Sequence, residues 1–269
     1  MHDNKISVER KKYLKKVTRN KIIIFITQIL LLVTFIAAWE ICANANIIDP
    51  FITSKPSRIL DTFMNLSQNG LLEHIGVTCF ETIIGFLSGT ILGIIVAIIL
   101  WWSNFLSKVA EPFLVVLNSL PKVALGPVII IWVGAGMPAI IVMALSISLI
   151  VTILEILNGF LSTDKEKIKM AKTFGANKFQ ILTKIVIPAN ISTFINSLKV
   201  NIGLSLVGVI SGEFLVSKAG LGYLIVYGGQ VFKLDLVIAS VIILGIVAAV
   251  MYESVVLLEK LITKTHIIN

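Results

Sequence analysis

Long apolar stretches dominate the chain and alternate with shorter polar stretches. Each apolar stretch can cross the hydrocarbon core of a membrane, which takes about 20 helical residues at about 1.5 Å per residue. Because unpaired backbone polar groups cannot face lipid, each stretch is predicted to be helical. The period-two alternation of a membrane β-barrel is absent from the sequence. The pattern therefore predicts an all-α polytopic membrane protein with six transmembrane helices, at about 22–42, 74–100, 109–133, 137–160, 190–211 and 235–258.

Composition agrees with this class. Of the 269 residues, 57% are hydrophobic and only 14% are charged, which is too apolar for an ordinary soluble domain. The first apolar stretch could also be read as a signal peptide, because basic residues precede it and Ala43-Asn44-Ala45 resembles a cleavage site. Its length exceeds the usual apolar core of a signal peptide, so an uncleaved anchor is the favoured reading.

The basic residues predict the orientation of the chain. With a cytoplasmic N-terminus, the predicted inner segments hold 17 lysines and arginines, of which eight lie in 1–21 and six in 161–189, whereas the outer segments hold four. This asymmetry follows the positive-inside rule and predicts cytoplasmic N- and C-termini. The net charge of +8 is then explained by topology and anionic lipid, and nucleic-acid binding is the weaker interpretation.

A few polar residues fall within the apolar stretches. Pro121, Lys122 and Pro127 lie in the middle of the third stretch, where proline bends a helix and a lysine needs a cavity or a partner. Alternatively, a helix begins near Pro121 and leaves Lys122 at the membrane interface. Among the carboxylates, Glu81 is expected to lie deep enough to need a partner, with Lys122 as one candidate, whereas Glu213 is expected at a helix end.

The 161–189 loop is a cationic interruption of the apolar pattern. Thr163 and Glu166 are spaced as a capping box, and Gly175 is suited to end the helix that follows. Asn177 can cap a second short helix, and Pro188 fits the first turn of the fifth transmembrane helix. Each short helix is predicted to be amphipathic, with its apolar face formed by Ile168, Ala171, Phe174 and Gly175, or by Phe179, Leu182, Ile185 and Val186.

This loop resembles that of the permease subunits of bacterial ATP-driven importers that rely on an external binding protein. Their pattern is EAA, three residues, G, nine residues and then I-x-L-P, and this chain has Lys169-Met170-Ala171, Gly175 and Ile185-Val186-Ile187-Pro188 at the same spacing. Lys169 replaces the glutamate of that pattern and Met170 replaces its first alanine, so the contact with the partner must differ here.

Further segments resemble the nitrate, sulfonate and taurine branch of these permeases, and the resemblance covers about residues 50–260. They are "GFLSGTILGI" at 85–94, "LPKVALGPVIIIWVGAG" at 120–136, the spacing of 156–164 and "GLGYLI" at 220–225. Glu81 stands where many sulfonate-type members are expected to have arginine. This difference favours a neutral or cationic solute, such as a vitamin-precursor heterocycle, over an oxyanion.

The resemblance implies a type I ABC importer permease-like fold in the bacterial cytoplasmic membrane. It implies two permease subunits that form the pathway, ATPase subunits docked on the cytoplasmic side and an extracytoplasmic solute-binding protein. The permease itself would bind no cofactor or metal, with ATP and Mg²⁺ held by the ATPase, and it has no GxxxxGK[ST] loop. The residues assigned to ATPase coupling are Asp164, Lys169, Met170, Ala171, Phe174, Gly175, Ala176, Phe179, Leu182, Ile185 and Pro188.

Two further groups of residues are candidates for function. The translocation pathway is assigned Glu81, Pro121, Lys122, Pro127 and Glu213. Gly220 and Gly222 are placed in the last outer loop, where they close the outer mouth, touch the binding protein or form an ordinary surface turn.

The predicted organisation has five parts. They are a basic cytoplasmic N-terminus (1–21), a first transmembrane helix (22–42), an outer loop (43–73), a permease core with five transmembrane helices (74–260) and a cytoplasmic tail (261–269).

Two other classes of protein were weighed. An ion-coupled secondary transporter of a small solute predicts paired half-sequences, and no convincing internal repeat is present. A membrane-embedded enzyme predicts convergent His, Asp or Cys residues within the apolar stretches, and the sequence shows none. Cys42 and Cys79 also lack the spacing of a metal or redox site. An importer permease is therefore the favoured reading.

Overall fold

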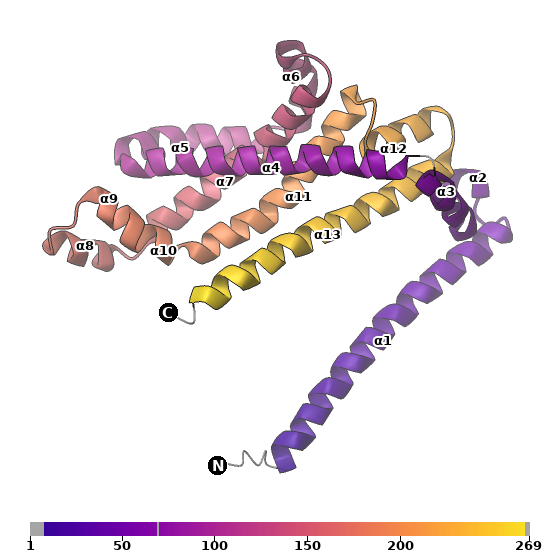
Figure 1. The fold of residues 1–269 in the computed structure, drawn as a ribbon, viewed down its shortest axis with the longest axis horizontal. Helices are drawn as coiled ribbons and strands as arrows, with labels where there is room; N and C mark the ends of the chain where they lie inside the picture. Colours follow the sequence, from indigo (N-terminus) through magenta and orange to yellow (C-terminus); the bar gives the residue numbers. More distant parts are fainter. Residues whose placement is uncertain (1–7, 69, 267–269) are drawn as a thin grey trace. The chain divides into compact units, whose positions relative to one another are not determined.

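The computed structural model describes residues 8–68 and 70–266. Residues 1–7 of the predicted N-terminus, residue 69 and residues 267–269 of the predicted tail lie outside the described residues. The described chain is helical and divides into two compact units, 1–64 and 65–269, which are considered separately (Figure 1). This all-helical architecture confirms the predicted fold class.

The first unit begins with the long helix α1 (Val8–Asn44), whose apolar stretch is fully exposed within the described structure. The short helix α2 (Pro50–Thr53) and most of α3 (Pro56–Gln68) follow. The Glu40 carboxylate accepts hydrogen bonds from the backbone N–H and the hydroxyl of Ser57, each at 3.0 Å. This contact holds the start of α3 against the end of α1.

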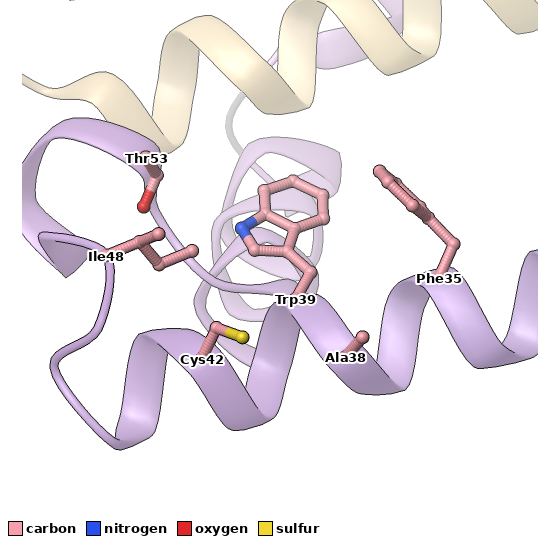
Figure 2. A pocket seen from close by; sticks show the side chains of 6 residues that line it. All are labelled: Phe35, Ala38, Trp39, Cys42, Ile48 and Thr53. Atoms are coloured by element: carbon pink, nitrogen blue, oxygen red, sulfur yellow. The ribbon is translucent and has the colours of Figure 1, made fainter.

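An apolar hollow of about 500 Å³ lies at the C-terminal end of α1 (Figure 2). Phe35, Ala38, Trp39 and Cys42 line it from one side of α1, and Ile48 and Thr53 line it from the chain that follows. Aromatic side chains at the end of an apolar helix are typical of the interface between membrane and water.

The second unit contains the remaining helices. Its long helices are α4 (Leu71–Trp102), α7 (Met137–Ser162), α11 (Ile191–Val216) and α13 (Leu234–His266). Together with α1, these give five helices within the described residues that are long and apolar enough to span a membrane. The helices between them are α5 (Asn104–Ser119), η1 (Lys122–Leu125), α6 (Gly126–Val133), α8 (Lys165–Thr173), α9 (Lys178–Ile181), the π-helical turn η2 (Leu182–Val186), α10 (Ile187–Ala189) and α12 (Leu221–Gln230).

The third predicted transmembrane helix is broken. The α5 helix and the η1–α6 segment are long and apolar enough to span a membrane only when taken together, and the chain bends by 88° between them. The break occurs at Pro121, where a helix is expected to lose a backbone hydrogen bond. Counting this pair as one span gives the predicted six.

Small residues let α4 and α11 approach α7 closely. An added Cβ at Gly85, Gly89 or Gly93 of α4 would lie within 2.0–2.5 Å of a side-chain atom of α7, in Ala144, Ser148 and Thr152 respectively. A Cβ at Gly208 of α11 would lie 2.6 Å from the Cα of the same residue, Ala144. This close packing of small residues is typical of helices associating in a membrane, where apolar burial gives little driving force.

Polar contacts add to this packing. The Asn201 side-chain amide of α11 donates to the Thr152 hydroxyl of α7 at 2.5 Å. Lys199 of α11 and Glu259 of α13 form a salt bridge of 2.5 Å. These contacts fix α7, α11 and α13 relative to one another and leave the 161–189 loop at one end of α7 and α11 (Figure 1).

Candidate functional site

The first half of the 161–189 loop is the exposed helix α8. Its N-cap is Asp164, whose carboxylate accepts a hydrogen bond of 2.8 Å from the Glu166 N–H. The predicted capping box of Thr163 and Glu166 is therefore wrong by one residue. Thr163 is buried and its hydroxyl oxygen accepts a hydrogen bond of 2.8 Å from the Asn190 side-chain amide, which ties the two ends of the loop together.

Gly175 ends α8 as its sequence position predicts. Its φ of +79° lies in the left-handed region that glycine adopts at low cost. The Ala176 N–H bonds to the Ala171 carbonyl at 3.0 Å and the Gly175 N–H bonds to the Lys172 carbonyl at 2.9 Å. These two bonds form a Schellman motif, the usual way to satisfy the last carbonyls of a helix.

The second half of the loop is built into the body of the second unit. Asn177 caps α9 in a full capping box with Gln180. The turn that follows is π-helical and is closed by a bond from the Ile187 N–H to the Leu182 carbonyl, directly before Pro188. Ile181, Leu182 and Val186 are buried in a core cluster with residues of α4, α5 and α7.

The predicted apolar faces are therefore only partly correct. Leu182 and Val186 face the core and Ile185 is half-buried, but Phe179 points outward and Ile181 takes its place. In α8, Ile168 and Ala171 pack against the core cluster, whereas Phe174 is 83% exposed. Met170, Phe174 and Phe179 form an exposed apolar group, which we call the 170/174/179 group.

Lys178 joins the loop to the end of α4, a contact that no local pattern predicts. Its ammonium group donates a hydrogen bond to the Trp102 carbonyl. The same nitrogen lies 5.9 Å from the ring centroid of Trp101 and 5.5 Å from that of Trp102. The residues are 76 positions apart in sequence, so only the tertiary fold reveals the pairing.

A buried polar cluster lies at the opposite end of α4. Glu81 of α4 and Glu213 of α11 are 1% and 2% exposed, and the Glu213 carboxylate accepts a hydrogen bond from Thr78, which precedes Glu81 by three residues in α4. Glu213 lies near the C-terminal end of α11, as expected, but it is buried to the same extent as Glu81. Within the described residues, neither carboxyl group forms a salt bridge, and the Glu81 Oε2 atom has no hydrogen-bond partner.

The helix α12, which the sequence analysis placed in a loop, begins against this cluster. The Glu213 Oε2 atom accepts a hydrogen bond of 2.5 Å from the Gly222 N–H, and Oε1 accepts one of 2.6 Å from the Thr78 hydroxyl. A Cβ at Gly220 would lie only 2.3 Å from Glu213 Oε1. Gly222 is buried as well, so these glycines enclose a carboxylate instead of forming a surface turn.

The candidate pathway residues of the third apolar stretch lie apart from this cluster in their contacts. Lys122 is half-buried in η1, and its ammonium group donates to the Asn118 carbonyl at 3.0 Å, so the candidate pairing with Glu81 is not observed. Pro121 precedes η1, and Pro127 lies in the first turn of α6. Lys122 therefore donates to a carbonyl at the C-terminal end of α5, a contact that stabilises the end of this helix.

Among the described residues, no group of three or more His, Cys, Asp or Glu side chains is placed to hold a metal ion. The arrangement instead presents an exposed apolar group at one end of the helices and a buried carboxylate pair at the other.

Comparisons with known proteins identify the family. A family model described as "Binding-protein-dependent transport system inner membrane component" matches residues 89–265. A probable ABC transporter permease of Haemophilus influenzae is 28% identical over 81% of this chain and 88% of its own length. The formylaminopyrimidine transport permease of Halalkalibacterium halodurans is 25% identical over 69% of this chain and 74% of its own length. A putative aliphatic sulfonates transport permease of Bacillus subtilis is 24% identical over 88% and 86%.

Solved structures share the fold. A chain of the MetNI methionine ABC transporter, in an inward-facing conformation, superposes with a TM-score of 0.62 at 18% identity, covering 69% of this chain and 92% of that chain. A chain of a bacterial ABC transporter involved in the import of the acidic polysaccharide alginate gives 0.64 at 16% identity, covering 94% and 99%. The predicted type I ABC importer permease-like fold is thus confirmed. The chain is a multi-pass membrane protein and belongs to the family of binding-protein-dependent transport system inner membrane components, the permease subunits of ABC importers, in the branch of the sulfonate and taurine permeases.

Proposed function

We propose that this chain is the membrane-spanning subunit through which an ATP-driven importer moves a small solute from a binding protein into the cytoplasm. Two copies would form the pathway, and separate ATPase subunits would bind and hydrolyse ATP with Mg²⁺. Family membership supports the ATPase and the binding protein as partners. The permease would itself bind no cofactor.

The observation that carries the proposal is the construction of the 161–189 loop. Its second half is anchored by Ile181, Leu182 and Val186, which are buried in the core, while the 170/174/179 group remains exposed. An exposed apolar group on an anchored helical loop is suited to dock in a groove of a partner protein, because its position is fixed before binding. The partner proposed here is the ATPase.

Replacement of Phe174 tests this docking directly. With the permease and its ATPase co-expressed, Phe174→Ser is expected to lose most of the ATPase during purification in detergent, since it removes the most exposed aromatic side chain of the group. Phe105→Ser is the matched control, because Phe105 in α5 is 74% exposed and lies outside the loop. Equal recovery of the ATPase with both variants would contradict the docking role.

The proposed orientation places the 161–189 loop in the cytoplasm and the start of α12 outside. A cysteine at Ser162 should then react with a membrane-impermeant reagent only after the cells are opened, and one at Lys218 should react in intact cells. Both are to be introduced after Cys42 and Cys79 are replaced. The reverse labelling would invert the topology.

The solute is proposed to be a sulfonate, taurine, nitrate or a vitamin-precursor heterocycle. Relatives named for aliphatic sulfonates, taurine and formylaminopyrimidine support all of these classes except nitrate, which rests on the sequence resemblance alone. Glu81 does not guide the choice among these solutes, because its side chain is only 1% exposed. Mass spectrometry of the ligand that co-purifies with the cognate binding protein would identify the solute, and a ligand outside these classes would overturn this range.

A further inference from the structure

The helix α4 is held at both of its ends by polar contacts to segments distant in sequence. At its C-terminal end, the Lys178 ammonium group bonds to the Trp102 carbonyl and lies over the Trp101 and Trp102 rings. A cation at the C-terminus of a helix interacts favourably with the helix dipole, and a cation over an indole ring adds a second attraction. Trp101 is held in turn by an edge-to-face contact with Phe160 of α7.

At its N-terminal end, α4 receives the first N–H groups of α12. The Gly220 N–H donates to His74 Nδ1 at 3.0 Å, and the Leu221 N–H donates to the Thr78 hydroxyl oxygen at 2.8 Å. Thr78 donates its own proton to Glu213, so one hydroxyl links α4, α11 and α12. The His74 ring also stacks on Tyr223, with 6.1 Å between the ring centroids. Side chains of α4 thus satisfy N–H groups at the start of α12 that would otherwise lack partners.

Between the contacts at its two ends, α4 is a continuous helix of 32 residues without an internal proline. Its length is about 48 Å at the usual rise per residue, so it connects the two ends of the bundle. A continuous helix packed closely along a neighbour transmits an axial shift better than a loop does, because its backbone hydrogen bonds resist local deformation.

We propose that α4 moves as a rigid helix and transmits movement of the 161–189 loop to α12. Lys178 is the positioning residue that links the loop to the C-terminal end of α4. A movement of the loop then reaches α4 through Lys178 and reaches α12 through His74 and Thr78. This inference rests on the proposed function, since the movement of the loop is caused by the docked ATPase. The competing route is α11, which is continuous with the loop through α10 and carries Glu213.

The test uses the assembled permease and ATPase in lipid nanodiscs, with the solute-loaded binding protein added. Lys178→Met removes the ammonium group and keeps a similar apolar stem. It is expected to leave ATPase recovery unchanged and to lower the stimulation of ATP hydrolysis by about 5- to 150-fold, the usual range of coupling between sites. Lys178→Arg should restore most of the stimulation, because a guanidinium group can bond to the same carbonyl and stack on the same rings.

Lys108→Met is the matched control, because Lys108 is an exposed lysine of α5 six residues beyond Trp102. An environment-sensitive label at Val231, at the end of α12, gives a readout of movement. Its emission should change on ATP binding in the wild type and in Lys108→Met, but not in Lys178→Met.

The failures are distinguishable. Loss of the ATPase from the wild-type complex would refute the proposed function. Loss of the ATPase only from Lys178→Met would make Lys178 a docking contact and would contradict transmission through α4. Normal stimulation and a normal Val231 signal in Lys178→Met would also contradict transmission through α4 and would favour transmission through α11.

A double-mutant cycle tests whether the Lys178 contact at the C-terminal end of α4 and the Thr78 contact at its N-terminal end transmit the same movement. Thr78→Val keeps the shape of the side chain and removes the hydroxyl that binds Leu221 and Glu213. If α4 transmits the movement, loss of either contact already interrupts it. Lys178→Met combined with Thr78→Val should therefore lose no more stimulation than the stronger single variant. Multiplied losses would mean independent routes and overturn the proposal. Should Thr78→Val fail to assemble, His74→Phe replaces it with the same expected outcomes, because it removes the acceptor for Gly220 and keeps an aromatic ring.

Discussion

Replacing Gly208 with alanine should separate α11 from α7, although it adds only one methyl group. The new Cβ would lie 2.6 Å from the Ala144 Cα and 3.0 Å from the Ala144 nitrogen. Carbon atoms reach a comfortable contact at about 3.5 Å, so α11 must move away by about 0.9 Å at this point. The atoms opposed to the methyl group belong to the backbone of α7, which cannot turn aside as a side chain can.

The magnitude follows from this geometry. Overpacking of a well-packed helix contact costs about 1–3 kcal/mol. Gly203→Ala on the same helix is the matched control, because no atom lies within 4 Å of an added Cβ at Gly203. This control should be neutral or more stable by about 0.5–1 kcal/mol, since alanine favours the helix over glycine. Because alanine favours the helix at both positions, this gain cancels, and the two variants should differ by about 1–3 kcal/mol in the free energy of unfolding.

The assay is reversible unfolding of the purified subunit in mixed micelles, with rising SDS and tryptophan fluorescence as the signal. Gly208→Ala should unfold at a lower SDS fraction than the wild type, and Gly203→Ala should not. Equal midpoints for the two alanine variants, or the reverse order, would refute the argument that small residues set the distance between α7 and α11.

The other predictions concern single positions of the 161–189 loop, of α12 and of η1. Gly220→Ala places a Cβ 2.3 Å from Glu213 Oε1 at a φ of +111°, so α12 amides should exchange hydrogen faster; unchanged protection would disprove that α12 is held by this contact. Gly175→Val meets no neighbouring atom but strains a left-handed residue by about 1–2 kcal/mol, so the protein should insert normally and retain less ATPase; full ATPase recovery with full transport would show the loop is misassigned. Lys122→Met should leave assembly and solute-stimulated ATP hydrolysis unchanged, because Lys122 bonds to Asn118; a loss of stimulation in the intact complex would return Lys122 to the pathway.

The sequence was sufficient for features that depend on local pattern. The apolar stretches correspond to the spanning helices, and Gly175 and Asn177 end and begin helices because their chemistry suits those positions without help from distant residues. The pattern predicts Thr163 as the N-cap of α8, but the N-cap is Asp164. Both residue types suit this position, and the Thr163 hydroxyl accepts a hydrogen bond from Asn190 instead.

Features that depend on tertiary contact could not be predicted. The burial of Glu213 at a helix end follows from α12 folding back over it, and α12 itself is short, apolar and rich in glycine. The exposure of Phe179 follows from the π-helical turn, which changes which residues of the second short helix face the core. The bond between Lys178 and Trp102 joins segments with no shared local signal. The division into the five predicted parts and the assigned coupling and pathway residues remain predictions.

If the 161–189 loop docks on a separate ATPase, as proposed, photo-crosslinking from position 174 in living cells should capture that contact. A photoreactive phenylalanine analogue replaces Phe174, the most exposed member of the 170/174/179 group, and Phe105 is replaced in the control strain. We expect mass spectrometry to find an ABC-type ATPase subunit cross-linked from position 174 and not from position 105. Cross-links from position 174 to lipid alone, with the ATPase expressed in the same cells, would contradict it.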